Sequence, residues 1–213
     1  MEHDGFLALD RGTGRYHLGP AIYPTAYLTQ SHSELVRVAH PHLESLARRT
    51  GETAGLGVDI DGWVVVVDEV PTLHASKLTL PIGMAQADLS MADAKLFLAF
   101  KSDSERQRRI AAGWPRLTPK TVVDPEELVR ELDRIRAEGV AYDLEEQRPG
   151  ICGMSVPVYD VLGRLRASLD VVVPAERLGV AEMKEYVQEA KAEALALSRD
   201  LGYEATPGPR GRT

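Results

Sequence analysis

The chain has 213 residues and a formal net charge of −7 at pH 7, and 44% of its residues are hydrophobic and 27% charged. These values are typical of an ordinary globular protein. The acidic balance argues against direct binding of nucleic acid, because phosphate contacts need a basic surface. The single cysteine excludes an internal disulfide and favours a reducing compartment. The start at Met1 lacks the features of a signal peptide, and no apolar run approaches the roughly 20 residues of a membrane span, so we expect a cytoplasmic protein.

The first fifty residues contain a small hairpin and then a helical stretch. Residues 6–9 and 16–18 are short apolar segments on either side of a glycine-containing turn. From Pro20 to about Thr50 the pattern is helical, and Pro41 should kink or split the second helix after His40. Gly51 is expected to end it.

Two strands are expected over residues 53–60 and 63–71, around the hairpin pair Asp61-Gly62. The uninterrupted run from Trp63 to Val67 predicts that both faces of the second strand are covered. Residues 75–80 are a candidate third strand. Helices are expected over residues 91–100 and 104–112.

The second half of the chain predicts one helix, three strands and a closing helix. Asp124 and Pro125 are typical of a helix start, and Gly139 of a helix end. Strands are expected over 139–142, 151–158 and 164–173, with a turn at 160–163, and residues 180–201 form an amphipathic helix. Because strands that are neighbours in sequence are joined by tight turns, the fold class is α+β, with a largely antiparallel sheet flanked by helices.

The strands between Gly139 and Pro174 are candidates for the wall of a pocket. Pairing between them can direct Asp143, Cys152 and Asp170 at one shared space. Asp170 and Val172 are two residues apart in one strand and therefore share a face. Nothing in this arrangement requires catalysis.

An ordered series of short motifs along nearly the whole chain resembles the IclR family of bacterial transcription regulators. The series comprises residues Pro41 to Leu43, Leu46 to Ala47, Thr50 to Thr53, Leu117 to Leu128, Ile135 to Asp143, Glu145 to Glu146, Gly150 to Cys152, Val156 to Val158, Gly163 and Val171 to Pro174.

The resemblance implies a winged helix-turn-helix followed by a GAF-like effector-binding domain. On this basis residues 1–19 are a wing-like remnant of the DNA-binding domain, residues 20–35 a linker helix, residues 36–205 the effector-binding domain, and residues 206–213 a flexible tail. The recognition helix has no counterpart in this sequence, so we expect it to contact operator DNA only through a further N-terminal module. The chain is then a fragment, or its start is assigned downstream of the true one. The family also implies a homodimer or a homotetramer.

The resemblance further implies that the domain binds a small metabolite that controls operator binding. The implied effector-binding residues are Met91, Ala92, Asp93, Asp143, Cys152, Asp170 and Val172. The sequence departs from the family at Ala94, where glycine is usual, and at Asp170, where small hydroxyl residues are usual. With three carboxylates facing one cavity, an anion is repelled unless a proton, a cation or Lys95 compensates. Our hypothesis is a cationic, polyhydroxylated or metal-bridged effector.

Two other functions are compatible with the sequence: a stand-alone binding module, and an enzyme or metal-binding protein that uses Asp93, Asp143 and Asp170. We expect no enzyme activity, no cofactor and no resident metal. Cys152 has no histidine near it in sequence to activate it, and is best interpreted as a small buried hydrophobic residue. The pair His40 and His42 is interpreted as a solvated turn. The basic residues Arg106, Arg108 and Arg109 are interpreted as part of a solvated helix face.

Overall fold

The structure, a computed structural model, describes residues 6–10, 12–18, 34–72, 74, 78–83 and 85–204. The chain divides into two units, Met1–Arg37 and Val38–Thr213. The expected tail at 206–213 lies outside the described residues, as does nearly all of the expected linker helix. Within the described part of the chain, no helix is long and apolar enough to cross a membrane.

The first unit contains the expected hairpin. Strand β1 (Leu7–Asp10) pairs antiparallel with β2 (Arg15–Leu18). Gly14 in the connection has a φ of 68°, a left-handed conformation that glycine adopts without strain.

The second unit is built on a six-stranded sheet with the order β5-β4-β3-β8-β7-β6, in which every pair is antiparallel. Its strands are β3 (Thr53–Ile60), β4 (Trp63–Val70), β5 (Ala85–Gln86), β6 (Ala141–Leu144), β7 (Ile151–Tyr159) and β8 (Leu165–Pro174). Its helices are α2 (Glu34–Thr50), α3 (Ala92–Ala99), α4 (Asp103–Ala111), α5 (Pro125–Glu138) and α6 (Val180–Asp200), with a short 3-10 turn, η1 (Ala175–Arg177). The predicted α+β class with an antiparallel sheet is confirmed.

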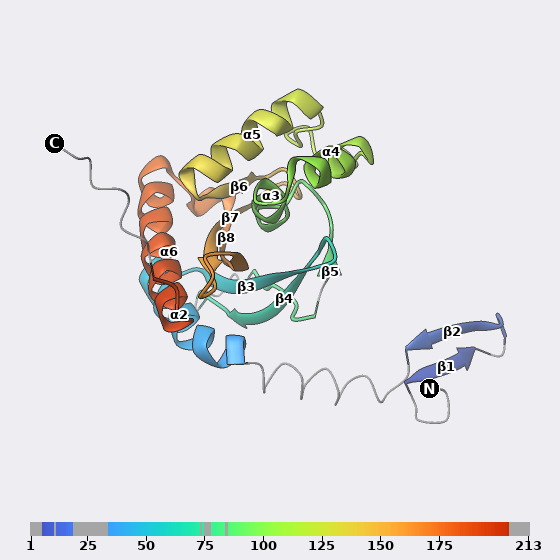
Figure 1. Cartoon of the computed structure of the whole chain (residues 1–213), viewed down its shortest axis with the longest axis horizontal. Helices are drawn as coiled ribbons and strands as arrows, with labels where there is room; N and C mark the ends of the chain where they lie inside the picture. The colour runs from blue at the N-terminus through green and yellow to red at the C-terminus, as the bar shows by residue number, and fades with distance from the viewer. Residues whose placement is uncertain are drawn as a thin grey trace. The chain divides into compact units, whose positions relative to one another are not determined.

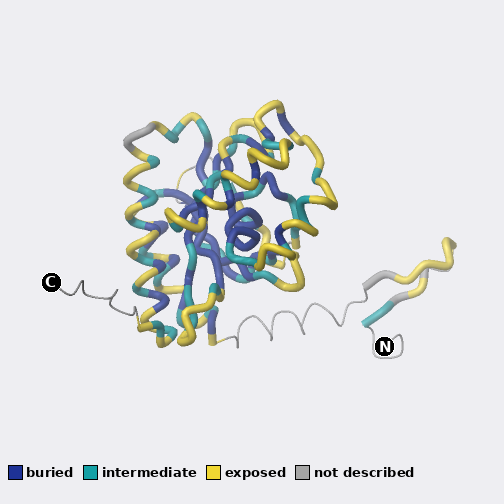
Figure 2. Tube along the Cα trace, turned by 45° about the horizontal axis from the view of Figure 1, so that its top comes forward, coloured by how far each residue is buried: buried dark blue, intermediate teal, exposed yellow. Residues whose placement is uncertain are grey.

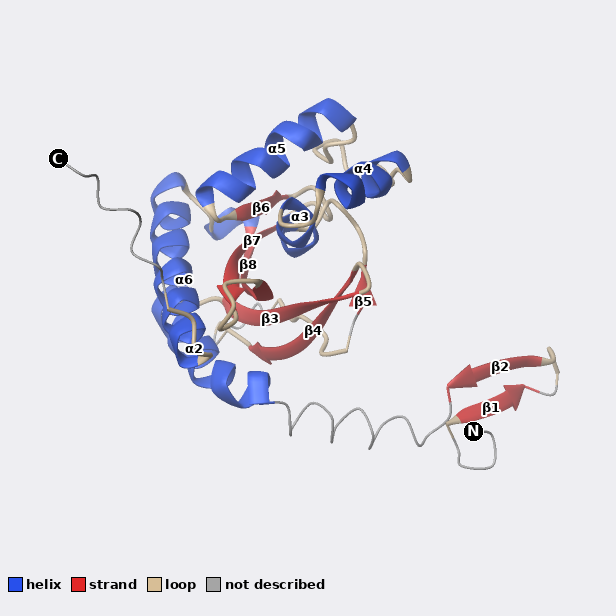
Figure 3. Ribbon diagram, viewed as in Figure 1, coloured by secondary structure: helices blue, strands red, loops and turns tan. Residues whose placement is uncertain are grey.

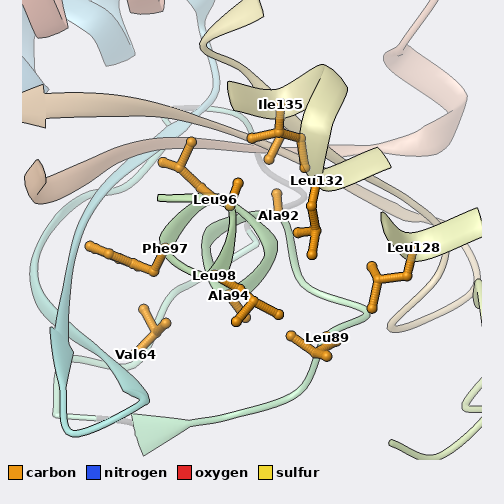
Figure 4. Packing of buried hydrophobic residues seen from close by; sticks show 12 residues of the cluster. Val64, Leu89, Ala92, Ala94, Leu96, Phe97, Leu98, Leu128, Leu132 and Ile135 are labelled. Carbon is orange, nitrogen blue, oxygen red and sulfur yellow. The ribbon is translucent and has the colours of Figure 1, made fainter. Parts of the chain in front are cut away.

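The sheet curls around α3, while α2 and α6 pack together on its outer side (Figures 1 and 3). Every residue of α3 is buried, which Figure 2 shows as the buried helix at the centre of the domain. The side of α3 that faces away from the sheet is covered by α5, whose Leu128, Leu132 and Ile135 face α3 in Figure 4. The helix is therefore held from both sides, and its N-terminal end has a fixed position above the sheet.

Local sequence explains where α5 begins and ends. The Asp124 side chain accepts a hydrogen bond from the backbone N–H of Glu127 at 2.8 Å, and Pro125 takes the first helical position. Gly139 then ends the helix with a φ of 64°. The predicted stripe of Leu128, Leu132 and Ile135 is fully buried.

The expected split of the helix at Pro41 is wrong, because α2 continues through this residue. Ala39 and Leu43, on either side of the proline, are both 0% exposed, so tertiary packing outweighs the cost of the proline. The turn expected at His40 and His42 is wrong for the same reason, although His40 is exposed as expected. The His40 Nδ1 lies 2.8 Å from Asp68 Oδ2, and the His42 Nδ1 lies 3.0 Å from Glu193 Oε2 of α6.

Three further expectations need correction. Strand β4 alternates between buried and half-buried residues, so its second face is only partly covered, and Trp63 is 54% exposed. The third strand of this part of the sheet is β5 at residues 85–86. Of the strand expected over 75–80, residues 78–80 are described and form no strand, and residues 75–77 lie outside the described residues. Arg106 does not lie on a solvated face: it is buried, and its guanidinium donates a 2.6 Å hydrogen bond to Asp133 of α5.

Candidate functional site

The register of the central strands brings polar side chains together on the sheet face that meets α3. Asp170 of β8 lies opposite Gly55 of β3 and opposite Ser155 of β7. Val172, two residues along β8, lies opposite Gly153, which in turn lies opposite Asp143 of β6. Because directly opposed residues of antiparallel strands share a face, these side chains form one floor.

Two glycines of β3 make room on this floor. A Cβ on Gly55 would come within 2.4 Å of Leu80 Cδ1, and one on Gly57 within 2.5 Å of Ser168 Oγ. The absence of side chains therefore lets Leu80 lie over β3, and lets the Ser168 hydroxyl approach the strand. Ser168 Oγ donates a hydrogen bond to Asp170 Oδ2 at 3.1 Å.

The N-terminal end of α3 forms the roof. Met91 precedes the helix in an extended conformation without a side-chain cap, and Ala92 and Asp93 form its first turn. Asp93 Oδ1 accepts a hydrogen bond from the backbone N–H of Ala94 at 2.7 Å. A carboxylate thus already occupies the positive end of this helix.

The connection between β6 and β7 closes one side. Asp143 Oδ1 accepts hydrogen bonds from the backbone N–H groups of Glu146 at 2.7 Å and Gln147 at 3.2 Å. The Gln147 side-chain amide donates to Gln86 Oε1 of β5 at 3.1 Å. This contact joins the connection to the opposite edge of the sheet.

Floor, roof and connection enclose a cavity of about 70 Å³. This volume is well below the roughly 300 Å³ at which sites for drug-sized ligands begin. All of the sequence-predicted site residues border it: Met91, Ala92, Asp93, Asp143, Cys152, Asp170 and Val172. Cys152 borders it at the start of β7, although strand alternation assigns its side chain to the opposite face from Gly153.

The cavity also has lining residues that the sequence did not predict, among them Val66, Leu80, Gln147, Gly153 and Ser155. Ser155 was not among the residues implied by the family resemblance, and a β-bulge between Val158 and Tyr159 hides its position opposite Asp170 from a simple count along the strands. Counting back from the turn after Tyr159 without the bulge pairs Asp170 with Met154. Such a one-residue slip moves the facing side chain to the other side of the sheet.

Burial controls the charge of the two carboxyls at the centre of the cavity. Desolvation raises the pKa of Asp93 to about 6, against the opposing effect of its hydrogen bond from Ala94. The pKa of Asp170 is raised well above its ordinary value, first by burial and then by the neighbouring charge of Asp93. The hydroxyls of Ser155 and Ser168 oppose this rise only in part.

The groups at the edge of the cavity are perturbed in the same direction. Burial raises the pKa of Asp143 to about 6, although the backbone N–H groups that it binds favour its charged form. Burial, followed by the charges of Asp143 and Glu145, raises the pKa of the Cys152 thiol. A raised thiol pKa disfavours the nucleophilic thiolate.

Lys95 does not point at the cavity carboxyls. Its side chain is 0% exposed, and its Nζ lies 2.8 Å from Glu131 Oε1 and 2.5 Å from Glu146 Oε1. These two acidic partners come from α5 and from the β6–β7 connection. Lys95 therefore forms ion pairs with Glu131 and Glu146, and among the three cavity carboxyls its charge favours the ionised form of Asp143 only.

Asp93, Asp143 and Asp170 do not converge as metal ligands. Among the residues that the structure describes, no group of three or more His, Cys, Asp or Glu side chains is arranged to hold a metal ion. A second and larger cavity of about 510 Å³ lies beside α3 and α4, with Asp59, Lys101 and Arg109 in its lining. Lys101 forms an ion pair with Asp59 there.

The second unit is thus an antiparallel sheet wrapped around one buried helix, with a small cavity at the end of that helix. Residues 26–199 match the model of the bacterial transcriptional regulator IclR C-terminal family. This match covers more than half of the chain, and the chain therefore belongs to the IclR family.

Individual relatives agree with this assignment. The glycerol operon regulatory protein of Streptomyces griseus is 32% identical over 205 residues, which cover 95% of this chain and 80% of the relative. The HTH-type transcriptional regulator KdgR of Escherichia coli is 27% identical over 97% of this chain and 79% of its own length. The crystal structure of IclR from Thermotoga maritima superposes with a TM-score of 0.78 at 30% identity, over 95% of this chain and 82% of that chain. These relatives are regulators of transcription.

Proposed function

We propose that residues 36–205 form the effector-binding domain of an IclR-type transcriptional regulator, and that the cavity under α3 holds the effector. The observation that carries the proposal is the convergence of side chains from α3, β6, β7 and β8 on one buried cavity. The cavity contains ionisable groups with raised pKa values, which are typical of functional sites. The family names of the relatives support the regulatory role.

The other parts of the chain have roles within this proposal. Residues 1–19 correspond to the wing of a DNA-binding domain, residues 20–35 to a linker helix and residues 206–213 to a flexible tail. Operator DNA is contacted through an N-terminal module to which the wing belongs. The regulator acts in the cytoplasm as a homodimer or homotetramer, away from membranes.

The bound effector would act by changing the populations of two arrangements of the domain. A ligand that binds one arrangement of the cavity better than another stabilises that arrangement by its difference in affinity. The Gln147–Gln86 contact is the element that such a ligand has to keep or to break, because it joins the β6–β7 connection to β5 beside the cavity. No bond is made or broken in this mechanism.

Thermal unfolding in the presence of a panel of small metabolites tests the proposal. A ligand that binds only the folded state at a hundredfold excess over its Kd stabilises it by about 2.7 kcal/mol. For a chain of this size that raises the midpoint by roughly 5–10 °C.

The variant Gly153→Val locates the site. A Cβ at this position meets only ordinary contacts, at 3.8 Å from Asp143 Cβ and 4.0 Å from the Val171 carbonyl, so the backbone accepts a side chain there, and valine takes up space in the cavity. We expect it to abolish the ligand-induced shift. The control Val129→Ala, at a residue of α5 that is 40% exposed, should keep the shift. A shift of equal size in all three proteins would show that the ligand binds elsewhere.

A further inference from the structure

One oxygen of the Asp170 carboxyl has no hydrogen bond of normal geometry among the described residues. Its Oδ2 accepts from Ser168, whereas its Oδ1 is buried and unpaired, although the Ser155 hydroxyl lies close enough to the carboxyl to favour its charged form. Asp170 as a whole is only 5% exposed, and it lines the cavity. A buried acceptor without a donor is costly, and such atoms in folded proteins usually mark a place where a ligand or water belongs.

A second carboxyl strengthens this acceptor. Asp93 of α3 is 7% exposed, lines the same cavity, and is close enough for its charge to raise the pKa of Asp170. The N–H of Ala94, which would otherwise attract an anion to the helix end, already donates to Asp93 Oδ1. The floor and the helix end therefore both present acceptors to the cavity.

Among the described residues that line the cavity, none carries a positive charge that balances these acceptors. Lys95, on the same helix, is paired with Glu131 and Glu146 on the other side of the roof. No lysine, arginine or histidine is among the described residues that line the cavity. The remaining lining includes the apolar side chains of Val66 and Val172.

We propose that the cavity binds a small molecule that carries a protonated amino group, which donates to Asp170 Oδ1 and faces Asp93, with a short uncharged remainder against Val66 and Val172. This inference rests on the proposed function, because it names the ligand class of the same cavity. A bound cation favours the ionised form of Asp170, which burial alone disfavours, and an ammonium group then donates to the carboxylate oxygens. A carboxylate ligand would add a further negative charge to two buried acids. The small volume limits the ligand to a few heavy atoms unless the β6–β7 connection opens.

Isothermal titration calorimetry of the full chain with three matched probes tests the ligand class. The probes are n-propylammonium chloride, 1-propanol and sodium propanoate, which share an apolar stem and differ in the charge of the head group. We expect n-propylammonium to bind about tenfold or more tightly than either of the others, because charge-assisted hydrogen bonds are the stronger ones. Equal or tighter binding of propanoate or 1-propanol would overturn the proposal, as would no heat from n-propylammonium at the highest concentration that the protein tolerates.

The variant Asp170→Asn tests the residue. It keeps the size of the side chain and removes its charge, and we expect about a tenfold or greater loss of n-propylammonium affinity. An unchanged affinity would overturn the assignment to Asp170. A thermal unfolding midpoint at or above that of the parent protein shows that the variant is folded. Asp170→Ser should weaken n-propylammonium in the same way while improving propanoate, because a hydroxyl can donate to the anion.

The variant Gly153→Val separates this inference from the proposed function. If propanoate binds best and is lost in Gly153→Val, the cavity remains the ligand site and only the ammonium class is wrong. If n-propylammonium binds equally well to the parent protein and to Gly153→Val, it does not occupy the cavity, and both proposals fail.

Discussion

The Nζ of Lys95 lies 2.5 Å from Oε1 of Glu146, in a position where the lysine side chain is 0% exposed and the glutamate side chain 9% exposed. This ion pair joins α3 to the β6–β7 connection, and so ties the roof of the cavity to the segment that contains Gln147. Glu146 is further fixed by the N–H of Val122, which donates to its Oε2 at 3.3 Å. The position of the connection beside the cavity is therefore set by a buried charge.

We expect Lys95→Met to destabilise the protein by about 3–5 kcal/mol, because it leaves Glu146 buried without its counter-charge. Urea unfolding measures the loss. The combined variant Lys95→Met with Glu146→Gln and Glu131→Gln should recover part of it, since no uncompensated charge is then left. A combined loss equal to the sum of the single losses would show that the three residues do not act as a unit.

Asp143→Asn should change the pH dependence of stability. The folded-state pKa of Asp143, about 6, lies above its ordinary value of 3.8, so the folded chain holds this proton more tightly. The stability from this group is therefore complete below pH 4 and is lost as the pH rises through about 6. Asparagine keeps the Oδ1 acceptor and removes the ionisation. The variant should be about 2 kcal/mol more stable than the parent at pH 7.5, and this advantage should vanish near pH 4.

Asp160→Asn is the matched control for that measurement. Hydrogen bonds to Arg164 and to backbone N–H groups lower the pKa of Asp160. Its contribution is present above its ordinary pKa and is lost as the pH falls, so the substitution should destabilise at neutral pH. A change of the same sign in both variants would contradict the assignment of opposite pKa shifts.

A second buried ion pair fastens the start of β3 to η1. Arg177 donates from Nε and Nη2 to the two carboxylate oxygens of Glu52, each at 2.7 Å, and Glu52 is 2% exposed. Arg177→Met should cost about 3 kcal/mol in urea unfolding, because the glutamate stays buried and unpaired. Arg164→Met, which removes a surface partner of Asp160, should change stability little. Equal losses would contradict this distinction.

The thiol of Cys152 should react slowly with a thiol reagent in the folded protein. It is 5% exposed, and its raised pKa keeps it protonated. We expect reaction to become fast once the chain is unfolded in urea, followed by absorbance of the released chromophore. Fast reaction of the folded protein would place the thiol in a more open environment than the structure gives it.

Local signals in the sequence were sufficient for most of the fold. The hairpin at Asp61-Gly62 forms with φ values of 52° and 87°, which this residue pair adopts readily. The ends of α5 follow from Asp124 and Gly139 in the same way. The cavity residues were predicted through the family resemblance, and their convergence agrees with the period of β8, which places Asp170 and Val172 on one face.

The features that the sequence did not predict depend on contacts between residues that are far apart in the sequence. The continuity of α2 through Pro41 depends on packing that a local rule does not contain. The burial of Lys95 depends on Glu131 and Glu146, which lie 36 and 51 residues away. Leu80, which lies in a loop, enters the cavity only because Gly55 of β3 leaves space for it. Such contacts can be identified only once the folded structure is known.

The most direct test of the account is to map a ligand on the folded chain. A ligand that raises the unfolding midpoint is added to isotope-labelled protein, and the amide resonances are followed by heteronuclear NMR. The account predicts that the largest shifts fall on Ala92, Gly153 and Val172, at the cavity under α3. Largest shifts on Asp59 and Lys101, at the larger cavity beside α4, would contradict it.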